Sequence, residues 1–268
     1  MNVAIVGLGL IGGSLAKAVK KNTGHTVYGV DIDRQVINKA LLTEAIDCEI
    51  TDTRELLKCD IILISLYPQA AVDFVKKNAG CFSKESLVID CCGVKKIVTE
   101  GILPVSMEKG FTYIGGHPMA GGENWGFSHS REGLFRNASM ILCANHASIQ
   151  QLEICKNFFL QLGFTRIQLT TPEEHDKMIA LTSQLAHVLS SAYVKSPSAL
   201  KHGGFSAGSF KDMTRVAKLN EDMWSELFLE NRDNLLMEID CLIERLREYE
   251  QSIRNNDREE LRRLLKEG

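Results

Sequence analysis

Three glycines near the start of the chain have the spacing of a phosphate-binding turn. Gly7, Gly9 and Gly12 form a G-x-G-x-x-G pattern directly after a short apolar run that is typical of a buried strand. The first glycine permits a tight turn, the second lets a pyrophosphate approach the backbone, and the third lets helix and strand pack closely. The helix that follows opens at Leu10 and Ile11, so its free N–H groups and positive dipole end can hold phosphates.

An acidic residue lies where such a site needs one. A second predicted strand, residues 26–30, ends in Asp31, which follows Gly12 by 19 residues. A carboxylate at that spacing accepts hydrogen bonds from the adenosine ribose hydroxyls and repels a 2′-phosphate. We therefore expect a binding site for NAD rather than NADP. A glycine turn without a ligand is the alternative interpretation.

Further candidate residues follow the ends of later predicted strands, where an open α/β sheet binds its ligands. The cofactor contacts expected there are Ser65, Gly93 and Lys95. His117 lies in a glycine-rich segment after a later strand, residues 115–126. Imidazole titrates near neutral pH and suits a general base. A histidine that only hydrogen-bonds the backbone of its loop is the alternative.

The last third of the chain carries two histidines and an arginine that can act on a substrate. His175 and His187 are twelve residues apart on one predicted helix. This spacing turns them about 120° away from each other, so they do not both face one point closely. On spacing alone, His175 is a solvated first-turn residue, whereas His187 follows an apolar, inward-facing segment. Arg215 either pairs with an acid such as Asp212 or Glu221, or binds a carboxylate substrate through both prongs of its guanidinium.

Length and composition indicate an ordinary globular protein, large enough for two domains. The chain has 268 residues, of which 44% are hydrophobic and 24% charged. A net charge of −3 gives no electrostatic reason to expect nucleic acid or an anionic membrane as a partner. The eight cysteines form neither a metal-binding nor a disulfide pattern, which favours the reducing cytoplasm. The first strand starts at once and no apolar run approaches ~18 residues, so we expect neither a signal peptide nor a membrane span.

Alternating strand and helix patterns predict an α/β fold, a doubly wound parallel sheet of the Rossmann type. Strands are expected at residues 3–6, 26–30, 48–51, 60–66, 87–90, 112–115, 138–143 and 165–169. Helices are expected after the glycine turn, after a capping Asp33, and at residues 53–57, 69–78 and 148–162.

The character of the chain changes at Thr171, where a capping box with proline at the first helical position begins a region without strand patterns. Helices are expected at residues 173–194, 206–217, 221–254 and 258–266. We therefore predict a Rossmann domain at residues 1–170 and an all-helical domain at 171–268. An apolar stripe from Trp224 to Leu246 is long enough to need cover, either in the core or in a dimer interface.

Taken together, these motifs resemble those of the prephenate dehydrogenase family over nearly the whole chain. The matching segments are residues 7–14, 116–121 with Glu123 and Gly126, 134–138, 174–176, 210–215 and 223–224. Many dehydrogenases share the first motif. The loop around His117 combined with the segment that ends in Arg215 is much more specific.

The resemblance implies oxidative decarboxylation of prephenate to 4-hydroxyphenylpyruvate in tyrosine biosynthesis, with NAD⁺ as the hydride acceptor. His117 matches the family's catalytic histidine, which accepts a hydrogen bond or proton from the ring hydroxyl. Arg215 matches an arginine that holds a substrate carboxylate, and His187 matches a histidine of the substrate pocket. His175 matches a supporting or gating position of that pocket, and Glu123 is also expected to bind substrate. A homodimer formed through the helical domain is the expected assembly.

Two departures from the family pattern stand out. Gly93 replaces a serine whose hydroxyl supports the catalytic histidine, so water or a backbone N–H must substitute for it. Gln184 replaces one of two histidines in the segment that ends at His187. Arogenate dehydrogenase or a dual-specificity cyclohexadienyl enzyme is an alternative, because the two substrates differ only in keto versus amino on the side chain. A catalytically silent NAD sensor would not need His117, Arg215 and Glu123 together.

Overall fold

The computed structural model describes residues 1–122, 124–144 and 146–268, and these form two compact units. The first unit consists of Met1–Asp176 and Glu221–Leu227. The second consists of Lys177–Asn220 and Phe228–Gly268. The chain thus leaves the first unit, returns to it for one short segment, and leaves it again.

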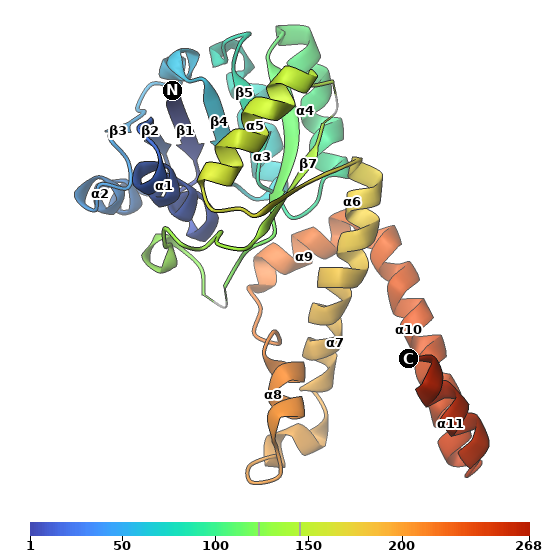
Figure 1. The fold of residues 1–268 in the computed structure, drawn as a ribbon. Coiled ribbons are helices and arrows are strands. Elements are labelled where there is room, and N and C mark those ends of the chain that lie inside the picture. The colour runs from blue at the N-terminus through green and yellow to red at the C-terminus, as the bar shows by residue number, and fades with distance from the viewer. Residues whose placement is uncertain (123, 145) are drawn as a thin grey trace. The chain divides into compact units, whose positions relative to one another are not determined.

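The described part of the first unit contains an eight-stranded sheet in the order β3-β2-β1-β4-β5-β6-β7-β8 (Figure 1). The strands are β1 Asn2–Val6, β2 Thr26–Val30, β3 Cys48–Glu49, β4 Ile61–Ile64, β5 Leu87–Asp90, β6 Thr112–Pro118, β7 Ser139–Cys143 and β8 Arg166–Thr170. Neighbouring strands run parallel except β6 and β7, which are antiparallel. The predicted fold class is confirmed, with one antiparallel pair in a sheet predicted to be parallel. A loop joins β6 to β7, and parallel pairing would need a crossover element instead.

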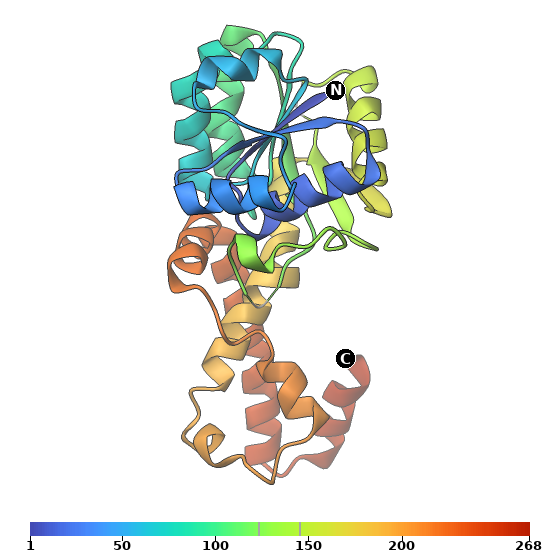
Figure 2. The same ribbon diagram turned by 90° about the vertical axis from the view of Figure 1, so that its left-hand side faces the viewer.

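Side chains alternate along the strands between two core layers. In β1, Val3 and Ile5 pack into one layer, and Ala4 and Val6 pack into the other. The first layer is covered by α1 (Leu10–Asn22), α2 (Arg34–Leu42) and α5 (Ile149–Gln161). The opposite layer is covered by α3 (Pro68–Asn78) and α4 (Lys96–Lys109). Figure 2 shows these helices on both sides of the sheet.

One local element differs from those that the sequence predicted. No helix was predicted between β5 and β6, where the structure has α4, because Gly101 and Pro104 interrupt its helical pattern. The helix predicted at residues 53–57 is present as a 3-10 helix, Thr53–Lys58. The N-cap predicted for α2 is confirmed, since the Asp33 carboxylate accepts a hydrogen bond from the backbone N–H of Gln35.

The C-terminal part of the described chain is helical. Its helices are α6 Pro172–Ile179, a π-helical turn Ala180–Gln184, α7 Leu185–Tyr193, α8 Gly208–Thr214, α9 Glu221–Glu230, α10 Arg232–Arg254 and α11 Arg258–Glu267, with a 3-10 turn at Pro197–Lys201. None of the described helices has the length and apolar character that a membrane span requires.

The prediction of one helix over residues 221–254 is wrong, because the helix breaks at Asn231. This residue is buried, and its side-chain amide donates to Gln184 Oε1 at 2.7 Å. Before the break, Trp224 and Leu227 join the core layer that also contains α3 and α4. The apolar stripe therefore divides, and only its later part belongs to the second unit.

Candidate active site

The glycine turn has the geometry that its sequence predicts. Gly7 has a φ of +84°, and a Cβ at Gly12 would lie 1.8 Å from the Gly7 carbonyl oxygen, so both positions require glycine. A Cβ at Gly9 would meet nothing within 4 Å. Gly9 is also the N-cap of α1 and provides no side-chain cap. The surface in front of the helix start, at Leu10 and Ile11, is therefore open and fits a pyrophosphate.

Asp31 lies directly beside this turn. Its Oδ2 accepts from the backbone N–H of Leu8 at 2.7 Å, and its Oδ1 accepts from that of Asp33 at 2.9 Å. These bonds fix a carboxylate at the edge of the glycine turn, where it can meet a ribose. Ser65 follows β4, and its buried Oγ has no hydrogen-bond partner of normal geometry among the described residues. The neighbouring thiol of Cys91 is only a weak partner for it.

Gly93 and Lys95 lie in the loop between β5 and α4, which a buried carboxylate organises. Asp90 forms an ion pair with Lys95 Nζ, and the side chains of both are at most 1% exposed. Burial opposes the charge on Lys95, but the Asp90 carboxylate outweighs it and raises the lysine pKa. The ammonium thus holds the loop from inside the protein. Its predicted contact with a cofactor stays a prediction.

Asp90 has further donors around it. The Tyr113 hydroxyl donates to it at 2.8 Å, the backbone N–H of Cys92 at 3.0 Å and that of Gly116 at 3.3 Å. These bonds tie the end of β5 to β6 just before His117. Asp90 was not among the site residues predicted from the sequence, although an acid that ends a fully apolar strand is an available signal.

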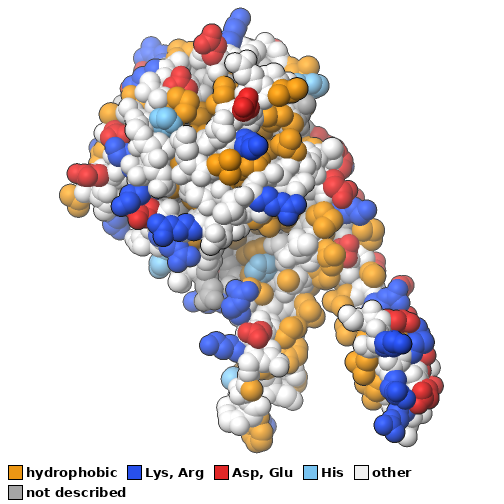
Figure 3. Space-filling model, in the orientation of Figure 1, with side chains coloured by type: hydrophobic (Ala, Val, Ile, Leu, Met, Phe, Trp, Pro, Cys, Tyr) orange, Lys and Arg blue, Asp and Glu red, His pale blue; other side chains and the backbone are white. Residues whose placement is uncertain are grey.

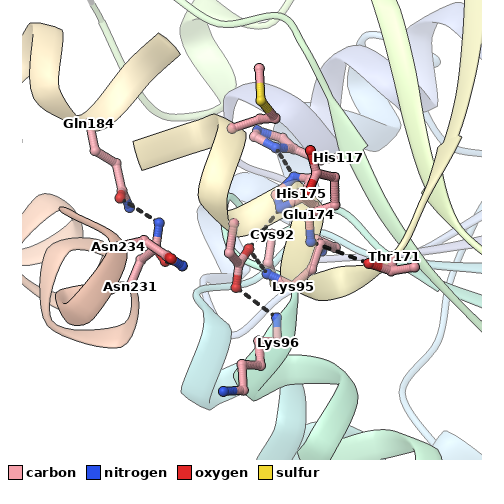
Figure 4. Close-up of polar contacts among 12 residues, drawn as sticks. Cys92, Lys95, Lys96, His117, Thr171, Glu174, His175, Gln184, Asn231 and Asn234 are labelled. Carbon is pink, nitrogen blue, oxygen red and sulfur yellow. Dashed lines mark hydrogen bonds and ion pairs between the residues drawn. The ribbon is translucent and has the colours of Figure 1, made fainter. Parts of the chain in front are cut away.

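His117 lies within β6 rather than on the loop after it, and it pairs with Ile141 of β7. Its Nδ1 lies 2.9 Å from His175 Nε2, and Figure 4 shows the two imidazole rings meeting. Burial lowers the pKa of His117 well below its usual value, and the nearby His175 and Lys95 lower it further. His117 is therefore neutral at neutral pH.

His175 is only 2% exposed, so the interpretation of it as a solvated first-turn residue is wrong. Its Nδ1 lies 2.7 Å from Asp176 Oδ1. The same carboxylate accepts from the backbone N–H groups of Lys95 at 2.7 Å and Lys96 at 2.9 Å (Figure 4). Asp176 therefore caps the start of α4. Asp176 lies in the matching segment 174–176, but helical spacing alone predicted no role for it.

In the second unit, His187 and Arg215 lie close to each other. His187 Nδ1 is 3.1 Å from the Val216 carbonyl oxygen. Burial lowers the pKa of His187, the hydrogen bond to Val216 opposes this, and the charge of Arg215 lowers the pKa further. Arg215 is exposed at the end of α8, and no ion pair to it occurs among the described residues of this unit. Glu123, the remaining predicted substrate residue, lies outside the described residues.

Sequence families match both parts of the chain. The family described as "Prephenate dehydrogenase, nucleotide-binding domain" matches residues 15–168. The family described as "Prephenate dehydrogenase, dimerization domain" matches residues 171–267. The cyclohexadienyl dehydrogenase of Zymomonas mobilis is 30% identical to the chain, and the match covers 100% of this chain and 93% of that protein.

Solved structures agree with these matches. The prephenate dehydrogenase of Aquifex aeolicus, in complex with hydroxyphenyl propionate and NAD⁺, is 29% identical with a TM-score of 0.88, covering 100% of this chain and 95% of the other. The arogenate dehydrogenase of Synechocystis is 28% identical with a TM-score of 0.84, covering 100% and 97%. The fold, the nucleotide-binding turn and the family matches to both parts of the chain all point to the same family. The chain therefore belongs to the prephenate dehydrogenase family of dehydrogenases.

Proposed function

We propose that this protein catalyses the NAD-dependent oxidative decarboxylation of prephenate to 4-hydroxyphenylpyruvate. The observation that carries the proposal is the contact of His117 with His175 near the end of β6, 2.9 Å between His117 Nδ1 and His175 Nε2, in a chain of this family. The open surface at Gly9 and the fixed carboxylate of Asp31 fit NAD. The relative from Aquifex aeolicus was crystallised with NAD⁺ and a hydroxyphenyl compound, which supports the same choice of ligands.

The chemistry assigns a role to each candidate residue. When bound, NAD⁺ accepts the hydride from the substrate carbon that bears the hydroxyl. His117 accepts a hydrogen bond or the proton from that hydroxyl, which favours loss of the hydride. The ring carboxylate then leaves as CO₂, and the ring becomes aromatic.

Substrate binding is assigned to the remaining candidates. Arg215 offers an exposed guanidinium that no acid neutralises within the described part of its unit, so it can hold a carboxylate through two hydrogen bonds. We assign His187 a supporting role in substrate binding beside Arg215, and we keep Glu123 as a substrate residue. Lys95 acts through the loop that it holds with Asp90.

Arogenate is the alternative substrate, because the relatives include an arogenate dehydrogenase and a cyclohexadienyl dehydrogenase at similar identity. The test is NADH formation with prephenate and with arogenate, side by side at equal concentrations. Faster turnover of prephenate supports the proposal. Turnover of arogenate alone would replace it, and turnover of neither would refute both.

We also propose that the protein is a homodimer formed through α10. Leu236, Ile243, Leu246 and Ile253 are between 39% and 64% exposed and lie along one side of this helix. Figure 3 shows apolar side chains beside charged ones on the C-terminal helices. The description of residues 171–267 as a dimerization domain supports this assembly. The domain boundary near Thr170 is part of the same proposal.

A further inference from the structure

Three side chains of the first unit form a continuous hydrogen-bonded row. Asp176 Oδ1 lies 2.7 Å from His175 Nδ1, and His175 Nε2 lies 2.9 Å from His117 Nδ1. His117 is on β6, whereas the other two are on α6. The row ends at the His117 ring, whose second nitrogen, Nε2, is the remaining position for a proton or a lone pair.

The carboxylate fixes which nitrogen carries each proton. An ionised carboxylate only accepts hydrogen bonds, so His175 Nδ1 must be the donor to Asp176. A neutral imidazole has one N–H, and His175 Nε2 is then an acceptor. The short distance to His117 therefore requires that His117 Nδ1 carries the proton. It follows that His117 Nε2 carries a lone pair.

The assignment depends on His175 being neutral, and its surroundings favour this state. Burial lowers the pKa of His175, and its bond to Asp176 opposes the shift only in part. The charged groups that act on it include Asp176, Asp90 and Lys95, and the lysine also lowers the pKa. A neutral His175 can accept the proton of His117, whereas a doubly protonated one could not.

The carboxylate is itself held in place by backbone. The N–H groups of Lys95 and Lys96, at the start of α4, donate to its two oxygens at 2.7 and 2.9 Å. Helix starts favour negative charge, and the two backbone donors hold both oxygens of Asp176 as acceptors in a fixed orientation. The row therefore has a fixed acceptor at one end.

Gly93 explains why this support matters in this chain. Glycine has no hydroxyl to offer His117, and a Cβ at this position would lie 3.3 Å from Leu227 Cδ2. The partner that the structure gives to His117 Nδ1 is the imidazole of His175. An imidazole thus stands where water or a backbone N–H was expected.

We propose that His175 and Asp176 are positioning residues that hold the proton of His117 on Nδ1 and so leave Nε2 as the proton acceptor for the substrate hydroxyl. The use of Nε2 rests on the proposed function, whereas the position of the proton does not. Without this row, a histidine in water favours the opposite tautomer, with its proton on Nε2. That form cannot accept the hydroxyl proton at Nε2.

The direct test is ¹⁵N NMR of the histidine rings in the protein without substrate, at pH 7.5. The spectrum distinguishes a protonated Nδ1 from a protonated Nε2, and loss of signals in H117N and H175L assigns the two rings among the seven histidines. We expect His117 and His175 both to carry the proton on Nδ1. A wild-type His117 protonated on Nε2 would overturn the proposal, whatever the activity.

Kinetics of two His175 variants give the second test. His175→Leu keeps volume but removes the acceptor, so kcat should fall at least about tenfold, within the roughly 10²–10⁴ that base catalysis contributes. KM should stay within about twofold, since the row does not bind substrate. His175→Gln offers an amide oxygen that can accept from Nδ1 and should recover most of the lost kcat. Asp176 is a poor test site, because its replacement also removes the cap of α4.

The controls separate this proposal from the proposed function. His129 is exposed and lies outside the row, so His129→Leu should leave kcat and the other ring signals unchanged. Equal kcat in wild type and His175→Leu would refute the positioning role even if prephenate is the substrate. Absence of turnover with either substrate would refute the proposed function and leave the NMR result standing. If His175→Leu does not fold, the wild-type spectrum and His175→Gln still decide.

Discussion

The buried ion pair between Asp90 and Lys95 makes an asymmetric prediction about stability. Replacing Asp90 with Asn leaves the Lys95 ammonium buried without its counter-charge. Removing one member of a buried pair in this way costs about 3–5 kcal/mol. For a domain of this size, that loss lowers the melting temperature by roughly 6–20 °C.

Replacing Lys95 with Met should cost less. The Asp90 carboxylate would keep three donors: the Tyr113 hydroxyl and the backbone N–H groups of Cys92 and Gly116. Because these bonds are retained, the free energy of unfolding should decrease by only about 1–3 kcal/mol. Lys20→Met is the matched control, because Lys20 pairs with Asp47 at 2.5 Å but both side chains are about one third exposed. That change should cost no more than about 1 kcal/mol.

Tryptophan fluorescence during urea unfolding measures the change in the free energy of unfolding of the first unit, which contains the ion pair. Both tryptophans of the chain, Trp125 and Trp224, belong to the first unit. NAD⁺ affinity, measured on the same proteins, shows whether Lys95 also touches the cofactor. A loss for Lys95→Met equal to that for Asp90→Asn would refute the reasoning. So would an Asp90→Asn protein within about 1 kcal/mol of wild type.

Four further predictions follow from the site. Asp31 should make NAD⁺ strongly preferred over NADP⁺, because its carboxylate repels a 2′-phosphate. Asp31→Asn should lower the ratio of kcat/KM with NAD⁺ to kcat/KM with NADP⁺ at least about tenfold, and an unchanged ratio would contradict this. Because burial lowers the pKa of His117 and His175, the unfolded chain binds their protons first as pH falls. The free energy of unfolding should therefore be highest above pH ~6.5 and should decrease at lower pH by up to about 1.4 kcal/mol per pH unit for each histidine. Urea unfolding at pH 7.5, 6.5 and 5.5 measures this dependence. Arg215→Gln should raise the KM for substrate about 10- to 150-fold, for a lost hydrogen bond to charge of about 1.5–3 kcal/mol, with no change in melting temperature because the side chain is exposed; a lower melting temperature with an unchanged KM would return this residue to a structural role. Leu246→Glu should yield a monomer by light scattering at micromolar concentration, whereas a stable dimer would place the interface elsewhere.

Local patterns in the sequence were sufficient to predict the nucleotide-binding half of the fold. The glycine turn, the strand before it and the helix after it are contiguous, so period and residue type determine them together. Asp31 was predictable for the same reason, because its distance from Gly12 along the chain is fixed by one helix and one strand. The helix α4 was missed where Gly101 and Pro104 weaken the local pattern and tertiary packing compensates.

Contacts between distant segments were not predictable in this way. Asp176 meets the backbone of Lys95, 81 residues earlier in the chain, and His175 meets His117 across 58 residues. Helical spacing describes only where a side chain leaves its own helix, so it assigned His175 to solvent. The residue is buried where the start of α6 meets His117 of β6 and the backbone at the start of α4, all within one unit.

The glycine at position 93, where the family usually has serine, is explained by a contact with a distant part of the chain. In the sequence it is a missing hydroxyl, and the expected substitute was water or a backbone N–H. In the structure, Leu227 from α9 approaches so closely that a Cβ at position 93 would lie 3.3 Å from it. A serine would therefore require Leu227 to move by a few tenths of an ångström in a packed layer. The small residue at position 93 and the large one at position 227 fit each other, and the partner of His117 Nδ1 in this structure is His175 of α6.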